Sequence, residues 1–186
     1  MLFNSPAFVF VFLPLVLAIF FVVALRGKNL HCVLFLGAAS LVFYGYWNPK
    51  YLVLILASIG GNFAISQAIC RAEKSQRRLL LALGIAFNLG ILGYFKYALF
   101  FVENAAALLG RGWSIDAIVL PLAISFFTFQ QIAYLVACWR GDAAPPALAR
   151  YLLFVAFFPQ LIAGPIVQHH EVLPQFEKLA QRPRLA

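Results

Sequence analysis

The sequence predicts an all-α protein that crosses a membrane several times. Of its 186 residues, 64% are hydrophobic and only 11% are charged, whereas a soluble domain is about half apolar and about a quarter charged. Charge-free runs recur along the chain, and each reaches the roughly 17–25 residues that a spanning helix needs. The runs are Met1–Leu25, Asn29–Pro49, Tyr51–Cys70, Leu79–Phe95, Ala117–Trp139 and Tyr151–His170. We expect five to six membrane segments in a single membrane domain, residues 1–186, with no separate soluble domain.

The first run, Met1–Leu25, is expected to remain in the mature protein as a membrane span. It lacks the basic start of a secretory signal, and its apolar core exceeds the roughly 7–15 residues of such signals. No A-x-A cleavage site precedes Arg26. The run therefore predicts a first transmembrane helix rather than a leader.

Small and amide side chains mark the third and fourth runs. Small residues let helix backbones approach closely in lipid, where packing rather than hydrophobicity drives association. Asn62 in the third run and Asn88 in the fourth are placed to bond across the two helices. The small residues are Ser58, Gly60, Gly61, Gly84, Gly90 and Gly93. We expect these positions to serve helix packing rather than ligand contact.

Lys96 is the only charged residue within Leu79–Val102. An ionisable residue inside a membrane is a functional candidate by default. However, Lys96 lies 17 residues after Leu79, which at a helical rise of about 1.5 Å per residue brings it close to the outer interface. With Tyr94 and Tyr97 beside it, Lys96 is expected to be interfacial, its ammonium group reaching the headgroups.

Polar residues gather among phenylalanines in the fifth run. Ser125 and Thr128 are three residues apart and share a helix face, although each can instead bond a preceding carbonyl of its own helix. Gln130 and Gln131 are costly in lipid, so at least one is expected to face protein. Ser125 stands in AISFF rather than G-x-S-x-G, which makes it a weak nucleophile candidate.

The sixth run is apolar enough for a bilayer, but it cannot form one continuous helix. It contains Pro159, Gln160, Gly164 and Pro165, and the two prolines lie six residues apart. Proline removes an amide donor and clashes with the preceding turn, and freed backbone groups in lipid cost roughly several kcal/mol each. We predict a re-entrant broken helix over residues 151–167 that shapes a cavity, with a fully crossing segment as the alternative.

The net charge of +8 reflects orientation rather than nucleic-acid binding. Basic residues follow the first, third and fifth runs, whereas the opposite loops hold only Lys50 and Arg111. The residues after the odd-numbered runs are Arg26, Lys28, Arg71, Lys74, Arg77, Arg78, Arg140 and Arg150. By the positive-inside rule, this asymmetry predicts a multi-pass protein with its N-terminus outside. Lys178, Arg182 and Arg184 join the cytoplasmic side only if residues 151–167 re-enter.

Composition and spacing alone identify no reaction. Cys32, Cys70 and Cys138 share no metal or redox spacing, and adjacent His169 and His170 point in different directions on any regular element. No Walker loop, dinucleotide glycine motif or H-x-x-x-x-D motif is present. We therefore expect the lipid bilayer as a partner, but no metal site, bound cofactor or nucleic acid.

Five strings stand out in a fixed order along the chain. They are NSPAFVFVFLPLVLAIFF at Asn4–Phe21, SLVFYGYWNPKYL at Ser40–Leu52, LGYFKYALFF at Leu92–Phe101, PLAISFFTFQQIAYLVACWRG at Pro121–Gly141 and FFPQLIAGPIVQHHEVLPQF at Phe157–Phe176. Together they resemble the N-terminal part of the membrane-bound O-acyltransferase (MBOAT) family. The alginate O-acetylation branch is the most similar, with the D-alanyl-lipoteichoic acid branch as a cousin.

The resemblance implies a ring of tilted, partly re-entrant helices in the bacterial inner membrane, where a cytoplasmic funnel meets a pocket from the other side. It implies transfer of an acetyl group from a cytoplasmic thioester donor, acetyl-CoA or an acyl carrier protein, towards an extracytoplasmic polysaccharide such as alginate. Implied partners are periplasmic or membrane-anchored acetyltransferases and a missing C-terminal half. The residues expected along the acyl path are Ser125, Thr128, Gln130, Gln131, Pro159, Gln160, Gly164 and Pro165.

The chain departs from the family in length and at one motif. The family's general base is a histidine on a later membrane helix, so the catalytic histidine is expected beyond Ala186, and His169 and His170 match variable positions. The family often has an acidic residue before its Y-R-G, where this chain has Ala137–Gly141. We expect this chain to be inactive alone. The alternatives are a non-catalytic membrane scaffold for a periplasmic acetyltransferase, or half of a transporter.

Overall fold

The computed structural model describes residues 5–25, 29–109, 120–163 and 169–179 of the chain. In these ranges the regular elements are helices, which confirms the all-α prediction. In chain order they are η1 (Phe8–Phe12), α1 (Leu13–Leu25), α2 (Asn29–Trp47), α3 (Pro49–Arg71), α4 (Lys74–Leu109), α5 (Ile124–Arg140), α6 (Leu148–Ala156), α7 (Phe158–Ala163) and α8 (His169–Phe176).

Four helical stretches of the described chain are long and apolar enough to cross a membrane. They are Phe8–Leu25, Asn29–Trp47, Pro49–Arg71 and Lys74–Ala98. The fifth run was expected to be helical over Ala117–Trp139, but α5 begins only at Ile124 and has 17 residues. Pro121 precedes this start, and Ala123 adopts a left-handed backbone conformation with φ 56°, so the helix cannot extend further back.

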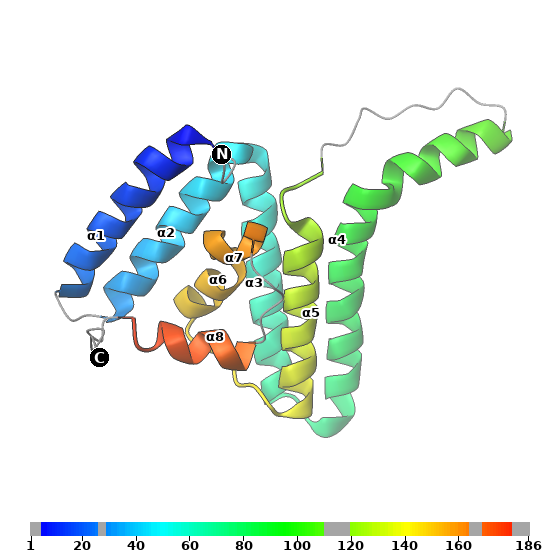
Figure 1. The fold of residues 1–186 in the computed structure, drawn as a ribbon. Helices are drawn as coiled ribbons and strands as arrows, with labels where there is room; N and C mark the ends of the chain where they lie inside the picture. Colours follow the sequence, from blue (N-terminus) through cyan, green and yellow to red (C-terminus); the bar gives the residue numbers. More distant parts are fainter. Residues whose placement is uncertain (1–4, 26–28, 110–119, 164–168, 180–186) are drawn as a thin grey trace.

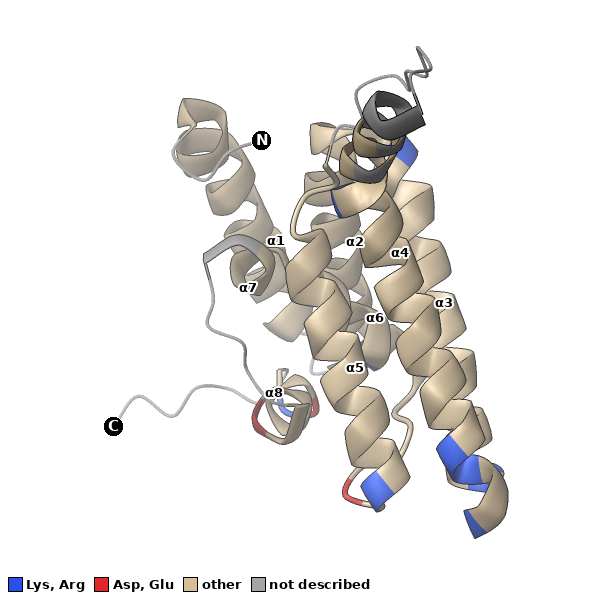
Figure 2. Cartoon of the chain, turned by 90° about the vertical axis from the view of Figure 1, so that its right-hand side faces the viewer, with Lys and Arg blue, Asp and Glu red and all other residues tan. Residues whose placement is uncertain are grey.

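The long helices stand side by side, with the short helix α6 enclosed between α2, α3 and α5 and with α7 packed against α2 (Figure 1). Helix α8 crosses below α6 and α7 in Figure 1 and lies beside the lower half of α5 in Figure 2, whereas the last turns of α4 lead away from the bundle (Figure 1). The centre of the bundle therefore holds the interrupted segment rather than another long helix.

Lysines and arginines lie towards the two ends of the bundle, and more of them lie at one end than at the other (Figure 2). We call the end where α3 meets α4 and where α5 finishes the basic end. It carries Arg71, Lys74, Arg77, Arg78 and Arg140. Lys50 is the second residue of α3 and Lys96 lies far along α4, so both are distant from the turn that joins these helices. This is the distribution that the sequence predicted.

The predicted asparagine pair joins α3 to α4. The Nδ2 atom of Asn62 donates to Oδ1 of Asn88 at 3.1 Å, and Nδ2 of Asn88 donates back to Oδ1 of Asn62 at 2.6 Å. Each amide also donates to a carbonyl one turn earlier in its own helix, at Ser58 and Gly84. Both side chains are buried, and the pair confirms that these residues serve helix packing.

The glycines divide into two groups. A Cβ atom at Gly84 would lie 2.7 Å from Cδ1 of Leu135, and one at Gly61 would lie 3.0 Å from Cζ of Phe87. These glycines allow neighbouring helices to approach, as predicted. At Gly60, Gly90 and Gly93 the added atom would meet nothing within 4 Å, so for these three the prediction of close packing is wrong within the described residues. At these three positions, α3 and α4 make no close contact with another described helix.

Replacing Gly84 with leucine is expected to destabilise the bundle, because the new side chain would separate α4 from α5. Overpacking of this kind costs about 1–3 kcal/mol. The matched control is Gly90→Leu, which changes the same helix by the same residue into open space. The midpoint of thermal unfolding in detergent should fall for Gly84→Leu and stay near the parent value for Gly90→Leu. Equal midpoints for the two variants would contradict the α4–α5 packing.

Candidate functional site

The sixth run is broken, as predicted, and the break lies directly before Pro159. Helix α6 ends at Ala156, Phe157 leaves the helical conformation with φ −55° and ψ 107°, and α7 starts at Phe158. Pro159 is thus in the first turn of a new helix, where its missing N–H would have no intrahelical partner. Gly164 and Pro165, which were also expected to break this segment, lie outside the described residues.

Side chains of neighbouring helices satisfy the backbone groups that the break frees. The N–H of Phe158 donates to Oγ of Ser40 on α2 at 3.3 Å. The carbonyl of Phe154, in the last turn of α6, accepts from Nε2 of Gln130 on α5 at 3.0 Å. In an unbroken helix these two backbone groups would bond to each other. Ser40 and Gln130 therefore replace the hydrogen bond that the break removes.

Phenylalanines pack around the start of α7. The ring of Phe158 lies 5.5 Å from that of Phe43 on α2 and 5.4 Å from that of Phe12 in η1, measured between centroids. Phe8 completes the cluster, 5.6 Å from Phe43. The break is therefore enclosed in protein on the side of η1 and α2.

After the break, the chain returns to the end from which it entered. Arg150, at the start of α6, forms an ion pair with Glu177 just after α8, with Nη1 and Oε1 2.7 Å apart. Nδ2 of Asn29, at the first residue of α2, donates to the carbonyl of Phe176 at 2.7 Å. The segments before and after α6–α7 thus meet at one end of the bundle, which confirms the re-entrant arrangement.

A second polar cluster ties α5 to α3 and α6. Nε2 of Gln131 donates to Oγ of Ser58 at 2.9 Å, and the hydroxyl of Tyr151 donates to Oε1 of Gln131 at 3.4 Å. All three side chains are buried. Gln131 therefore faces protein, as at least one of the glutamines was expected to do, and both ends of its amide have partners.

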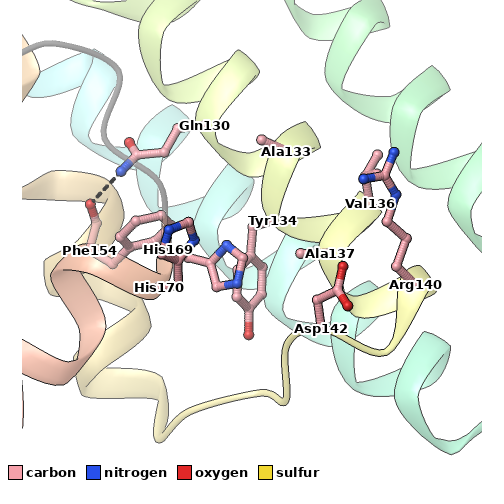
Figure 3. A pocket seen from close by; sticks show the side chains of 10 residues that line it. All are labelled: Gln130, Ala133, Tyr134, Val136, Ala137, Arg140, Asp142, Phe154, His169 and His170. Carbon is pink, nitrogen blue, oxygen red and sulfur yellow. Dashed lines mark hydrogen bonds between the residues drawn. The ribbon is translucent and has the colours of Figure 1, made fainter.

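A cavity of about 710 Å³ opens between α5, α6 and α8 near the basic end (Figure 3). Its lining residues are Gln130, Ala133, Tyr134, Val136, Ala137, Arg140, Asp142, Phe154, His169 and His170. Gln130 is only 2% exposed, and its Oε1 atom has no hydrogen-bond partner among the described residues. A buried acceptor without a partner is costly, and this oxygen atom is itself buried rather than accessible from the cavity.

The two histidines of α8 stand beside Tyr134 in this cavity (Figure 3). The imidazole of His169 meets the Tyr134 ring edge-on, with centroids 5.5 Å apart. Burial, and then the neighbouring His170, lower the pKa of His169, while Asp142 opposes this shift. His169 therefore favours its neutral form. No group of three metal-ligating side chains exists within the described part of the chain.

The residues that the sequence analysis expected along the acyl path differ in how deeply their side chains are buried. Thr128, Gln130, Gln131 and Gln160 are buried, whereas Ser125 and Pro159 are half-buried. Of these, Gln130 alone lines the cavity, and Nε2 of Gln160 is a second buried amide atom without a described partner. Lys96 is exposed, with Nζ 5.6 Å from the centroid of Tyr97. A path-lining role for the set remains a prediction.

His169 and His170 were assigned no role from the sequence. They reach the cavity because the broken segment returns α8 to the end of α5, although 35 residues separate Tyr134 from His169 in the chain. The prolines and the basic tail predicted re-entry. Re-entry in turn implies that the residues after the broken segment lie near the end of α5, and this is the signal in the sequence that could have placed the histidines there.

Comparison with known proteins matches the chain to bacterial O-acetyltransferases. It is 40% identical over 204 residues to a peptidoglycan O-acetyltransferase of Helicobacter pylori, covering 95% of this chain and 39% of that protein. It is 37% identical over 185 residues to a probable alginate O-acetylase, AlgI, of Azotobacter vinelandii, covering 95% of this chain and 36% of that protein. The probable AlgI of Pseudomonas aeruginosa is 36% identical over 185 residues, with coverages of 95% and 34%.

The chain thus spans about a third to two fifths of the length of these curated relatives. No family model and no solved structure matches the chain.

Replacing Ser40 with alanine is expected to destabilise the broken segment, because the N–H of Phe158 would lose its partner in a buried position. An unsatisfied buried donor costs about 1–3 kcal/mol. Ser66→Ala is the matched control, since Ser66 is also buried and, among the described residues, its hydroxyl donates to the carbonyl of Phe63 in its own helix. Thermal unfolding in detergent should show a lower midpoint for Ser40→Ala than for Ser66→Ala, and the reverse order would contradict this role.

Acidification is expected to weaken the docking of α8. Because the pKa of His169 is lowered from its usual 6.5, the unfolded chain binds more protons at this residue than the folded chain as the pH falls through that range. The contribution of neutral His169 to the free energy of unfolding is therefore complete above its usual pKa, and it is lost as the pH falls below that value. Unfolding midpoints measured at about pH 7.5 and about pH 5.5 should differ more in the parent protein than in His169→Gln. An equal pH response in both would contradict this expectation.

Proposed function

We propose that the chain belongs to the membrane-bound O-acyltransferase family, which its motifs resemble, and its similarity to bacterial O-acetyltransferases supports this proposal. The chain forms the N-terminal portion of an enzyme that moves an acetyl group from a cytoplasmic thioester donor, acetyl-CoA or an acyl carrier protein, to an extracytoplasmic polysaccharide such as alginate. The observation that carries this proposal is 40% identity over 95% of the chain to a protein named as a peptidoglycan O-acetyltransferase.

The charge distribution supports a particular orientation for this enzyme. The basic end carries most of the described cations, and such ends face the cytoplasm in multi-pass proteins. The N-terminus then lies outside a bacterial inner membrane. In this orientation the cavity beside Gln130, Tyr134 and His169 opens towards the compartment that supplies the thioester.

The interrupted segment supports a path for the acyl group. Irregular backbone at membrane depth is tolerated where it is enclosed by protein or borders a cavity, and α6–α7 does both. Within this proposal, the polar residues of α5 and the broken segment shape the wall of the path. Their contribution is positioning and hydrogen bonding.

The chemical step requires a base that these residues do not supply. The thioester C–S bond breaks and an ester C–O bond forms, while the proton of the acceptor hydroxyl passes to a base and finally to the released thiol. General-base assistance contributes about 10²–10⁴-fold. We propose that the catalytic histidine belongs to a C-terminal half beyond Ala186, and that periplasmic or membrane-anchored acetyltransferases act as partners.

A chimera tests the proposal. Residues 1–186 would replace the aligned segment of the Helicobacter pylori relative, and the cells would be assayed for acetate released by base from peptidoglycan. We expect O-acetylation above that of a control from which the aligned segment is deleted. A chimera that inserts stably into the membrane and yields no acetylation would count against the proposal.

The isolated chain provides the complementary test. Purified residues 1–186 in lipid nanodiscs are expected to transfer no acetyl group from acetyl-CoA to an alginate oligosaccharide above background, because the base is missing. Detectable transfer would overturn the requirement for a later histidine. Co-purification with a periplasmic acetyltransferase, combined with an inactive chimera, would instead favour the scaffold alternative.

A further inference from the structure

A second hollow of about 700 Å³ lies at the basic end, where α3 turns into α4 and α5 finishes. We call it the basic cleft. Its lining residues are Ala72, Glu73, Lys74, Arg77, Arg78, Trp139 and Arg140. It is separate from the cavity beside Gln130, but Arg140 lines both.

The basic cleft gathers positive charge that the described protein does not neutralise. Four of its lining residues are cations, and one, Glu73, is a carboxylate. Among the described residues the salt bridge that forms is Arg150 with Glu177, outside the cleft. Cations crowded together repel one another, so an anion bound between them would relieve the repulsion.

The turn between α3 and α4 fixes part of this surface. Nε of Arg77 donates to the carbonyl of Ala72 at 3.0 Å, which holds the guanidinium side chain across the turn. The carbonyl of Glu73 accepts from the N–H groups of Gln76 and Arg77 at 2.9 and 3.2 Å, closing the first turn of α4. Arg78 and Arg140 are exposed, so their guanidinium groups are accessible to a ligand.

The chemistry of the cleft favours phosphate among common anions. The arginine guanidinium is a planar fork that binds phosphate through two parallel hydrogen bonds, and lysine adds a point charge. Trp139, 40% exposed, contributes an aromatic surface to the wall. Such a site accommodates a charged group beside a flat or apolar one.

We propose that the basic cleft binds a phosphate group at the cytoplasmic entrance to the Gln130 cavity, and that this phosphate belongs to the thioester donor. The assignment to the donor rests on the proposed function, because acetyl-CoA and acyl carrier proteins both carry phosphate on the arm that ends in the thioester. Arg140 connects the two spaces, so a ligand anchored by phosphate in the cleft lies next to the cavity. Anionic lipid headgroups offer the same chemistry, and the experiment separates the two sources.

The test measures binding rather than acetyl transfer, so it is independent of the missing base. The chain in nanodiscs of neutral phosphatidylcholine would be titrated with coenzyme A, and with pantetheine as a probe that lacks phosphate. Arg78→Gln/Arg140→Gln removes two exposed cations of the cleft. The matched control, Lys50→Gln/Arg71→Gln, removes two exposed cations that do not line it.

We expect the cleft variant to weaken coenzyme A binding by about tenfold or more, because charge-assisted hydrogen bonds are lost. The control variant should bind like the parent, and pantetheine should bind much more weakly than coenzyme A. A third variant, Arg78→Lys/Arg140→Lys, keeps the charge but loses the forks and should give an intermediate affinity. Unfolding midpoints would verify that all variants remain folded.

The second arm uses phosphatidylglycerol, with retained lipid measured by mass spectrometry. If coenzyme A does not bind, but the parent retains phosphatidylglycerol that the cleft variant loses, the phosphate site stands with a lipid headgroup as its source. If neither ligand distinguishes the cleft variant from the control, the proposal is overturned. Failure here would leave the chimera result, and thus the proposed acetyltransferase function, unaffected.

Discussion

The structure depends on one constraint: a helix broken inside an apolar bundle must find new partners for its backbone. The break between α6 and α7 frees the Phe158 N–H and the Phe154 carbonyl, which an intact helix would pair with each other. Ser40 and Gln130 accept and donate the replacement hydrogen bonds. The positions of α2 and α5 are therefore set by the hydrogen-bonding needs of the segment that they enclose.

This constraint explains why polar residues occur where apolar ones would be expected. Gln131, Ser58 and Tyr151 form a buried network between α5, α3 and α6, and Asn62 with Asn88 joins α3 to α4. Without a hydrophobic drive between helices in lipid, such bonds and close small-residue contacts specify which faces meet. The bundle is thus held in register around α6–α7, and the cavity at its basic end has a defined wall.

Local chemistry in the sequence was sufficient to predict the break and the asparagine pair. Proline cannot continue the ladder of hydrogen bonds, and two amides on adjacent spans have few other partners, so neither inference needed the tertiary fold. The glycines show the limit of this reasoning. Gly84 and Gly90 are indistinguishable by sequence, because only the packing of α5 decides which face of α4 is crowded. The same limit concealed His169 and His170, whose place beside Tyr134 depends on where the re-entrant chain returns.

Gln130 links the constraint to the candidate site. Its amide has one donor group and one acceptor, and the Phe154 carbonyl can bind only the donor. The Nε2 atom must therefore point towards α6, which leaves Oε1 as a buried acceptor without a described partner. Turning the amide round would place two oxygen atoms against each other and lose the bond that secures the break. The interaction that stabilises the interrupted helix therefore also fixes the orientation of the Gln130 amide in the cavity wall, at the cost of leaving its oxygen buried without a described partner.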